Sequence, residues 1–211
     1  MGVKERKQRD KESIRRKILA AAETLFVQEG YENVSMRKLA NRIEYSPTTI
    51  YHHFKDKEEL LSCLVQEIFT QFIAYQDACL GEGPDADPVT AIRRGMRAYI
   101  QFGLENPNYY RLAFASGLLA KASPALGDGG GAPQQAFRIL QQLVAAAIEQ
   151  QYFPARDPAL IAQTLWAVNH GITSLLLTHI RITESQQEEL IGQVIDTALD
   201  GLLHQKLREQ G

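Results

Sequence analysis

The chain has 211 residues, of which 45% are hydrophobic and 23% charged, and its formal net charge is −2. This composition is sufficient for a substantial core and excludes an intrinsically disordered chain. No apolar run is judged long enough to span a bilayer, and the charged N-terminus lacks the hydrophobic region of a secretory signal. The sequence therefore predicts a cytoplasmic protein without a membrane segment.

The charge is distributed unevenly along the chain. Residues 1–57 carry 13 Lys and Arg against 8 Asp and Glu, a net charge of +5, whereas the remaining residues carry −7. A positive N-terminal part is attracted to a phosphate backbone. Because a charged segment is more often simply a solvated face, this distribution only supports the more specific evidence from motifs.

Residues 1–11 are expected to be mobile because they contain too little apolar surface to pack. Their cations have two interpretations, a basic arm that reaches DNA or a solubilising tail. These cations are Lys4, Arg6, Lys7 and Arg9. From residue 13 to residue 29 apolar side chains recur at helical spacing, which predicts a helix ended by Gly30.

Residues 35–54, SMRKLANRIEYSPTTIYHHF, are predicted to form two short helices joined by a tight turn. The first helix begins after the N-cap Ser35 and buries an apolar stripe. The second N-cap is Ser46, and Pro47 occupies the first helical position, where its missing N–H costs nothing. This pattern is typical of a helix-turn-helix.

The exposed surface of the second helix favours DNA binding over an ordinary helical hairpin in a core. A solvated helix normally carries Glu and Lys there, but this helix exposes hydroxyl, phenol and imidazole groups. Such groups suit a groove, because Thr can meet a thymine methyl or a base edge, and Tyr and His can donate to phosphate oxygens.

At these residues the stretch resembles the helix-turn-helix of the TetR family. The family signature is a hydroxyl N-cap, R-x-[IL]-A, a serine-started second helix, T-[IL]-Y-x-[HY]-F and a following K-x-x-L. The matching residues are Ser35, Arg37, Leu39, Ala40, Ser46, Thr49, Ile50, Tyr51, His53, Phe54, Lys57 and Leu60. The resemblance also implies that Lys57 contacts a phosphate. The predicted DNA-binding set is Ser35, Arg37, Ser46, Thr48, Thr49, Tyr51, His52, His53 and Lys57.

One position in this stretch departs from the family pattern. Glu44 stands where the family usually has Gly. Because Gly suits a positive φ, the turn is expected to be either strained or built differently. Glu44 also places a carboxylate near the DNA face, where it would narrow the choice of operator.

The remainder of the chain is predicted to be helical. Asp56 and Glu59 make a capping box for a long helix that ends near Leu80. Residues 81–88, GEGPDADP, have the composition of a linker. Further helices are expected at about residues 89–104, 109–120, 134–151, 158–178 and 185–206. With no strand periodicity, the sequence predicts an all-α fold of about nine helices.

The sequence gives little support for catalysis, for a cofactor or for a metal. It contains no G-x-S-x-G, Walker or H-E-x-x-H motif. His52 and His53 are adjacent on a helix and cannot chelate one ion together. Gly127 to Ala132 fits a degenerate dinucleotide pattern, but no strand precedes it and Pro133 follows, so it is interpreted as a loop.

Trp166, His170 and Gly171 form the pattern W-x-x-x-H-G, which places the first two residues on one face of a helix. Packing is one explanation, a core histidine with a backbone partner. The other is that His170 and Asn169 orient a ligand in an apolar pocket. The pattern resembles the C-terminal domain type of TetR regulators that is named for these three letters.

A high density of large apolar side chains supports the ligand interpretation. The predicted ligand-binding set is Met96, Tyr99, Phe102, Tyr109, Tyr110, Phe114, Phe137, Trp166, Asn169 and His170. Few fixed charges accompany them apart from Arg97 and Arg111, so the expected effector is apolar or weakly anionic. The loop around Gly129 is expected to be the entrance.

Taken with the residues, the resemblance implies a dimeric transcriptional regulator that is not an enzyme. It has a three-helix DNA-binding head (residues 1–57) and a ligand-binding and dimerisation body (residues 58–211), with the homodimer formed through the last two helices. The expected function is repression from a palindromic double-stranded operator, released by the effector. Two alternatives stay open, a ligand-independent dimeric regulator and a helical enzyme or small-molecule carrier without DNA binding.

Overall fold

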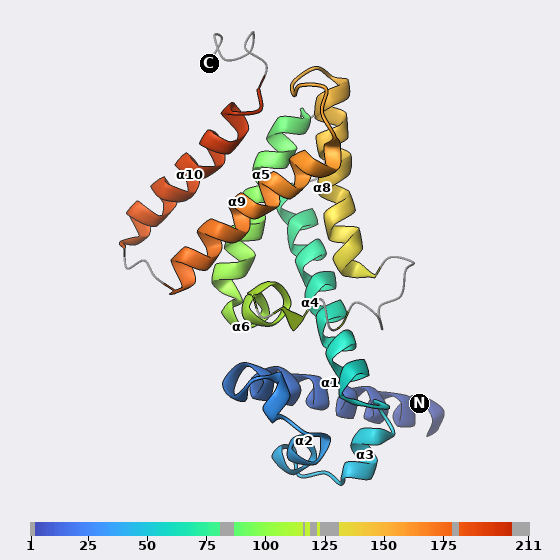
Figure 1. Cartoon of the computed structure of the whole chain (residues 1–211). Helices are drawn as coiled ribbons and strands as arrows, with labels where there is room; N and C mark the ends of the chain where they lie inside the picture. Colours follow the sequence, from blue (N-terminus) through green and yellow to red (C-terminus); the bar gives the residue numbers. More distant parts are fainter. Residues whose placement is uncertain are drawn as a thin grey trace. The chain divides into compact units, whose positions relative to one another are not determined.

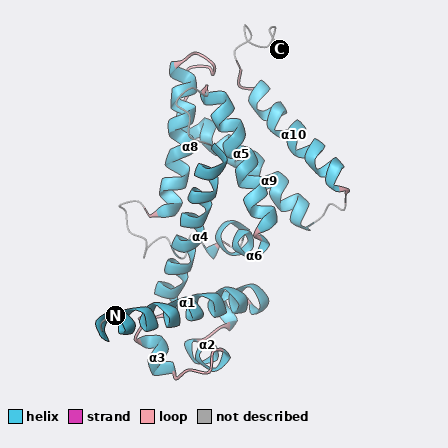
Figure 2. Ribbon diagram, turned by 180° about the vertical axis from the view of Figure 1, so that it is seen from behind, coloured by secondary structure: helices cyan, strands magenta, loops and turns pink. Residues whose placement is uncertain are grey.

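The computed structural model describes residues 3–80, 87–115, 117–118, 122, 131–178 and 182–203. Across these ranges the chain forms nine α-helices and no strand, which confirms the predicted all-α fold (Figures 1 and 2). Packing divides the chain into two compact units, one made of Met1–Ile68 and Asn108–Gly129 and the other of Phe69–Pro107 and Gly130–Gly211. The functional division after residue 57 stays a prediction.

The first unit is built on a small helical head. Its elements are α1 (Val3–Glu29), the 3₁₀ turn η1 (Tyr31–Asn33), α2 (Met36–Arg42), α3 (Pro47–Tyr51), the start of α4 (Lys57–Leu80), α6 (Pro107–Tyr110) and the π-helical turn η2 (Arg111–Ala115). Each helix of the head buries a large apolar side chain that is at most 1% exposed, namely Ile18 of α1, Leu39 of α2 and Ile50 of α3. These side chains meet in one core, so the predicted apolar stripes do face inward.

The N-terminal segment differs from the prediction. Residues 1–11 were expected to be mobile, but α1 begins at Val3 and continues without interruption to Glu29. Most residues in this part are Lys, Arg, Glu and Gln, which are good helix formers, and the packed part of α1 supplies a nucleus from which the helix can propagate. A basic helical extension therefore replaces the predicted flexible arm.

The second unit contains the end of α4 together with four further helices. They are α5 (Pro88–Glu105), α8 (Ala132–Glu149), α9 (Pro158–Thr178) and α10 (Glu184–Asp200). Helices α5, α8 and α9 pack against one another, and α10 packs on α5 and α9. Asp87 caps α5 by accepting from the backbone N–H of Thr90 at 2.9 Å, and Thr183 begins α10 with a capping box.

Two predicted helices have different ends in the structure. After the expected break at Asn106, α6 lasts only to Tyr110 and is followed by a π-helical turn rather than a helix to residue 120. The last helix ends at Asp200 rather than at residue 206. Most of the predicted linker, residues 81–86, and the loop around Gly129 lie outside the described residues.

Candidate nucleic-acid interface

Side-chain caps fix the starts of α2 and α3. Ser35 Oγ accepts a hydrogen bond from the backbone N–H of Lys38 at 3.2 Å. Ser46 Oγ accepts from the backbone N–H of Thr49 at 3.1 Å and lies 2.9 Å from the Thr49 hydroxyl. These bonds satisfy amide groups that a helix leaves without partners at its start. Both predicted N-caps are present, and their serines orient the helices.

The residue that departs from the family pattern has the backbone conformation that favours glycine. Glu44 has φ of 59°, in the left-handed region. The chain still closes the turn, because the N–H of Glu44 donates to Asn41 at 3.3 Å and that of Tyr45 to Ala40 at 3.0 Å. The turn is therefore strained rather than built differently, and the side chain of Glu44 is exposed.

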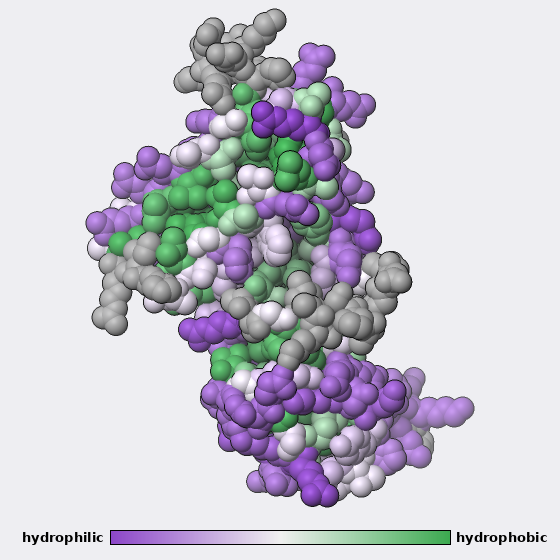
Figure 3. Space-filling view, in the orientation of Figure 1, coloured by the Kyte–Doolittle hydropathy of each residue, from purple (hydrophilic) through white to green (hydrophobic). Residues whose placement is uncertain are grey.

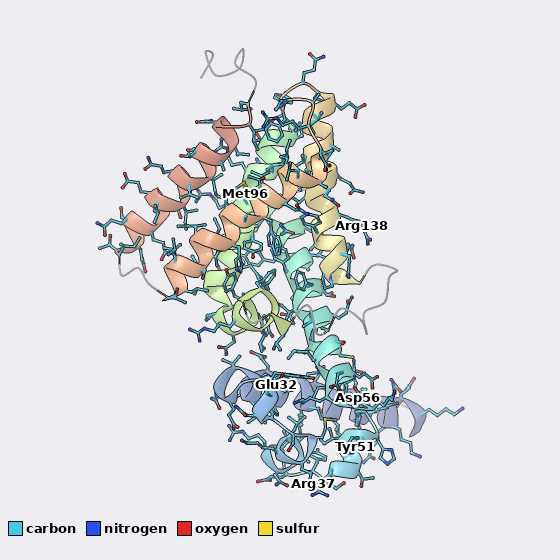
Figure 4. All side chains as sticks on the ribbon, viewed as in Figure 1. Glu32, Arg37, Tyr51, Asp56, Met96 and Arg138 are labelled. Carbon is cyan, nitrogen blue, oxygen red and sulfur yellow. The ribbon has the colours of Figure 1, made fainter. Side chains whose placement is uncertain are left out.

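The side of the head away from α1 presents the polar groups of both helices. Arg37, Thr48, Tyr51 and His52 are exposed, and Tyr51 keeps 53% of its surface accessible. Figure 4 places Arg37 and Tyr51 on this same side. The apolar members of α2 and α3 point the other way, into the core. This face therefore carries an exposed phenol, an exposed guanidinium and an exposed threonine, which supply hydrogen-bond donors, acceptors and a methyl group.

His53 behaves differently from its neighbour His52. It is half-buried, and its Nδ1 is buried without a hydrogen-bond partner. Burial lowers the pKa of the His53 imidazole from its ordinary value, and the nearby cations Lys11 and Arg15 lower it further. The structure thus places His53 at the edge of the head core rather than fully on the exposed face.

Lys57 also lies partly inside the head. Its Nζ donates to the backbone carbonyls of Tyr31 at 3.0 Å and Val34 at 3.1 Å, and it lies 4.1 Å from the centre of the Tyr31 ring. The sequence gives no signal for these contacts, because they join residues more than twenty positions apart. Lys57 therefore ties η1 and the segment after it to the first turn of α4.

The residues predicted to bind a ligand are divided between the two packing units. Tyr109, Tyr110 and Phe114 belong to the first unit, where the rings of Tyr110 and Phe114 stack with centroids 5.7 Å apart. The others belong to the second unit, namely Met96, Tyr99, Phe102, Phe137, Trp166, Asn169 and His170. The predicted ligand-binding set is therefore divided between two packing units.

Within the second unit, α4, α5 and α9 bring polar and aromatic groups together. Phe72 contacts the rings of Tyr99 and Phe102, with centroids 5.6 and 5.3 Å away. The Tyr99 hydroxyl lies 3.5 Å from Nδ1 of His170, and burial lowers the pKa of that imidazole. Asn169 is only 4% exposed, and its Oδ1 is buried without a partner. A buried acceptor of this kind is costly unless a donor reaches it.

Trp166 lies on the flank of α9 toward α8. Its ring contacts Phe137 at 6.3 Å and His170 at 6.2 Å, and 38% of its surface is accessible. Among the described residues there is no group of three His, Cys, Asp or Glu side chains that could hold a metal ion.

These features define a helix-turn-helix protein, in which two capped helices present one polar face on a helical head. Residues 18–63 match the family of bacterial regulatory proteins called the tetR family, and residues 92–198 match the tetracyclin repressor-like C-terminal domain. The second range contains Trp166, His170 and Gly171. The chain belongs to the TetR family of DNA-binding transcriptional regulators, whose members are not enzymes, and the predicted family is confirmed.

Relatives and solved structures agree with this assignment. An HTH-type transcriptional regulator of Staphylococcus aureus (strain USA300) is 36% identical over 67 residues, which cover 32% of this chain and 36% of the relative. The match thus spans about a third of the relative's length.

Two solved structures extend the similarity over most of the chain. The fold is similar to a TetR family regulator from Marinobacter aquaeolei VT8, with a TM-score of 0.72 and 21% identity over 94% of this chain and 100% of that chain. It is also similar to PfmR, a TetR family regulator from Thermus thermophilus, with a TM-score of 0.63 and 26% identity over 89% and 99% of the two chains.

Proposed function

We propose that the chain is a repressor whose head reads a palindromic operator in the major groove. The observation that carries this proposal is the single exposed face of α2 and α3, where Arg37, Thr48 and Tyr51 point outward while the apolar side chains are buried. A helix-turn-helix uses such a face to contact base edges and the backbone beside them.

The contacts of this face divide into two groups. Arg37, Thr48 and Thr49 are proposed to meet base edges, with the methyl of Thr49 available because its hydroxyl lies against Ser46. Tyr51, His52 and Lys57 are proposed to meet phosphates. Lys57 already donates to two carbonyls, so one of its three N–H groups is left for a phosphate oxygen.

Further, we propose that the chain acts as a homodimer through α9 and α10. One face of α9 is exposed and carries no charge, and it contains Leu160, Ala167, Gly171 and Leu175. Figure 3 shows hydrophobic side chains gathered over α9 and α10. A second copy that covers this face would form a four-helix bundle, and two heads related by a two-fold axis require a palindromic site.

The apolar character of α9 could also indicate a membrane-spanning helix. By length and composition alone, Pro158–Thr178 is long and apolar enough to cross a membrane, so the expectation that no run reaches this length was wrong. One such helix is weak evidence for a membrane span. We propose that a partner copy covers α9 and that the protein is cytoplasmic.

The proposed effector is a small apolar molecule held by the second unit, with Asn169 and His170 as its polar contacts. Arg97 could serve as a counter-ion for an anionic ligand, but it forms an exposed ion pair with Glu188 of α10. Asn169 Oδ1 is instead a buried acceptor without a donor, which suits a hydroxyl or amide on the ligand. The partial exposure of Trp166 favours the alternative of a ligand-independent regulator.

Footprinting on the DNA upstream of the protein's own coding sequence tests the proposal. The expected result is protection of two half-sites related by a dyad, with binding that weakens steeply as salt rises. Release of this DNA by a hydrophobic compound that also quenches Trp166 would support the repressor. Quenching with unchanged DNA affinity would favour the ligand-independent regulator, and absence of any protected site would overturn DNA reading.

A further inference from the structure

The N-terminal part of α1 extends past the hydrophobic core of the head. Every residue from Lys4 to Ser13 is exposed, and the first fully buried side chain of the helix is Ile18. In Figures 1 and 2 this end of α1 lies on the α3 side of the head, whereas α2 lies near the other half of the helix. The extension is therefore an exposed helical segment beside the end of α3.

Helical geometry shows which side chains of the extension face in the direction of the core. Each residue turns the helix by about 100°, so the buried stripe of Ile18 and Ala22 continues toward the N-terminus through Arg15, Lys11, Lys7 and Lys4. Gln8 also lies on this stripe, and no acidic residue does. The acids Glu5, Asp10 and Glu12 lie about 100° or more from its centre, on the outer side of α1 with Arg6, Arg9 and Arg16.

Contacts within the head confirm the direction of this cationic stripe. The guanidinium of Arg15 lies 4.6 Å from the centre of the Phe54 ring. Lys11 and Arg15 act electrostatically on His53, which follows α3, and the acid Glu12 acts on it more weakly and in the opposite sense. The stripe thus faces the residues that follow the C-terminal end of α3.

We propose that Lys4, Lys7 and Lys11 form a second DNA contact, a row of ammonium groups on the phosphate backbone that flanks the segment facing α3. This inference rests on the proposed DNA-binding function. The core-facing side of α1 is directed at α2 and α3, whose outer face would meet the groove. The N-terminal end of α1 extends past α3 in Figure 1, and helical geometry puts the three lysines on the side of this end that continues the core-facing stripe.

The chemistry of the stripe fits a backbone contact and not base reading. Lysine ammonium groups are flexible point charges that contact phosphate without a fixed orientation, whereas base edges are read by planar, bidentate groups. Because the acids lie about 100° or more from the centre of the stripe, the repulsion that they exert on a polyanion is reduced. The outer arginines share their side of α1 with those acids, so they are expected to contribute little.

Two triple variants of the full chain, each losing three positive charges, test the inference. One is Lys4→Ala, Lys7→Ala and Lys11→Ala, and the other is Arg6→Ala, Arg9→Ala and Arg16→Ala. All six positions are exposed and Ala favours a helix, so α1 is expected to persist, which circular dichroism checks. Affinity for a duplex carrying the footprinted site is measured between about 50 and 200 mM salt.

The lysine variant is expected to lower the salt slope by about two to three units per head, because each phosphate contact contributes about 0.9. The arginine variant is expected to lower it by less than one unit. Removing the outermost base pairs of the footprint, whose backbone the lysines would contact, should weaken binding of the original chain but not of the lysine variant. Equal slopes for the two variants, with the original chain still binding, would overturn the inference alone. Failure of the original chain to bind would overturn the proposed function.

Discussion

The Nζ of Lys57 donates to the backbone carbonyl of Tyr31 at 3.0 Å and lies 4.1 Å from the centre of the Tyr31 ring. A second bond to the Val34 carbonyl, at 3.1 Å, completes the contact. The ammonium thus joins the segment between α1 and α2 to the start of α4. A residue that the family resemblance assigns to phosphate also holds the head together.

Replacing this lysine therefore has two expected effects. Lys57→Met should lower the free energy of unfolding by about 1–3 kcal/mol, because two carbonyls lose a charged donor at a part-buried site. It should also lower the salt slope of DNA binding by about one unit if its third N–H meets a phosphate. Lys55→Met, which removes an equal charge from an exposed position, is the control for urea unfolding. Equal stabilities of the two variants would show that the contact with Tyr31 contributes nothing.

The strain at Glu44 predicts a stabilising substitution. Glu44→Gly should raise the free energy of unfolding of the first unit by about 1 kcal/mol, because φ of 59° costs a side-chain residue about that amount. Gln151, at φ of 62° in the second unit, offers a matched control, since Gln151→Gly should stabilise that unit instead. Hydrogen exchange resolves the two units, and a loss of protection near residue 44 would contradict the strain.

The glycine on the exposed face of α9 gives a test of the dimer. A Cβ built at Gly171 meets nothing within 4 Å, so Gly171→Arg should fit the single chain and even favour the helix by about 1 kcal/mol. In a dimer packed on this face it would block close approach, and sedimentation should show a folded monomer. Gln142→Arg, at an exposed position of α8, should leave the dimer intact. A dimeric Gly171→Arg variant would place the interface elsewhere.

The buried imidazole of His53 predicts a pH dependence of stability. Burial lowers its pKa in the folded head below the ordinary value of 6.5, so the unfolded chain binds more protons in the window just below 6.5. The contribution of the neutral His53 imidazole to the free energy of unfolding is fully present above pH 6.5. It is lost as the pH falls through the pKa of His53 in the folded chain. His53→Tyr should flatten the dependence of the unfolding free energy on pH in this window.

Burial also lowers the pKa of His170, so the chains with and without His53 are best compared in a His170→Gln background. Urea unfolding at several pH values gives the required free energies. A decline toward low pH that is identical with and without His53 would assign the proton uptake to another group.

Local signals predicted the head well. The caps at Ser35 and Ser46 depend on residues three positions apart, so the sequence alone contains them. The extension of α1 was missed because apolar periodicity detects only the packed part of a helix, and residues 4–13 are exposed. Their charge pattern, with lysines at helical spacing and acids on the other side, was the available signal.

Contacts between distant residues were not predictable in this way. Tyr99 and Tyr110 are close in sequence and equally aromatic, yet they belong to different packing units, because the chain changes unit after Pro107. The hydrogen bond from Lys57 to the Tyr31 carbonyl likewise depends on the path of the chain between them. Sequence patterns give the helices and their buried faces, whereas the partners of a buried side chain come only from tertiary packing.

The central claim, that the exposed face of α2 and α3 reads DNA, is tested most directly by the base preference of Arg37→Ala. Affinity of the original chain and of this variant is measured for the footprinted operator and for versions with single base changes. We expect the variant to lose about 1–3 kcal/mol on the operator and to become indifferent to one position in each half-site. A variant that keeps the full preference at every position would contradict the account.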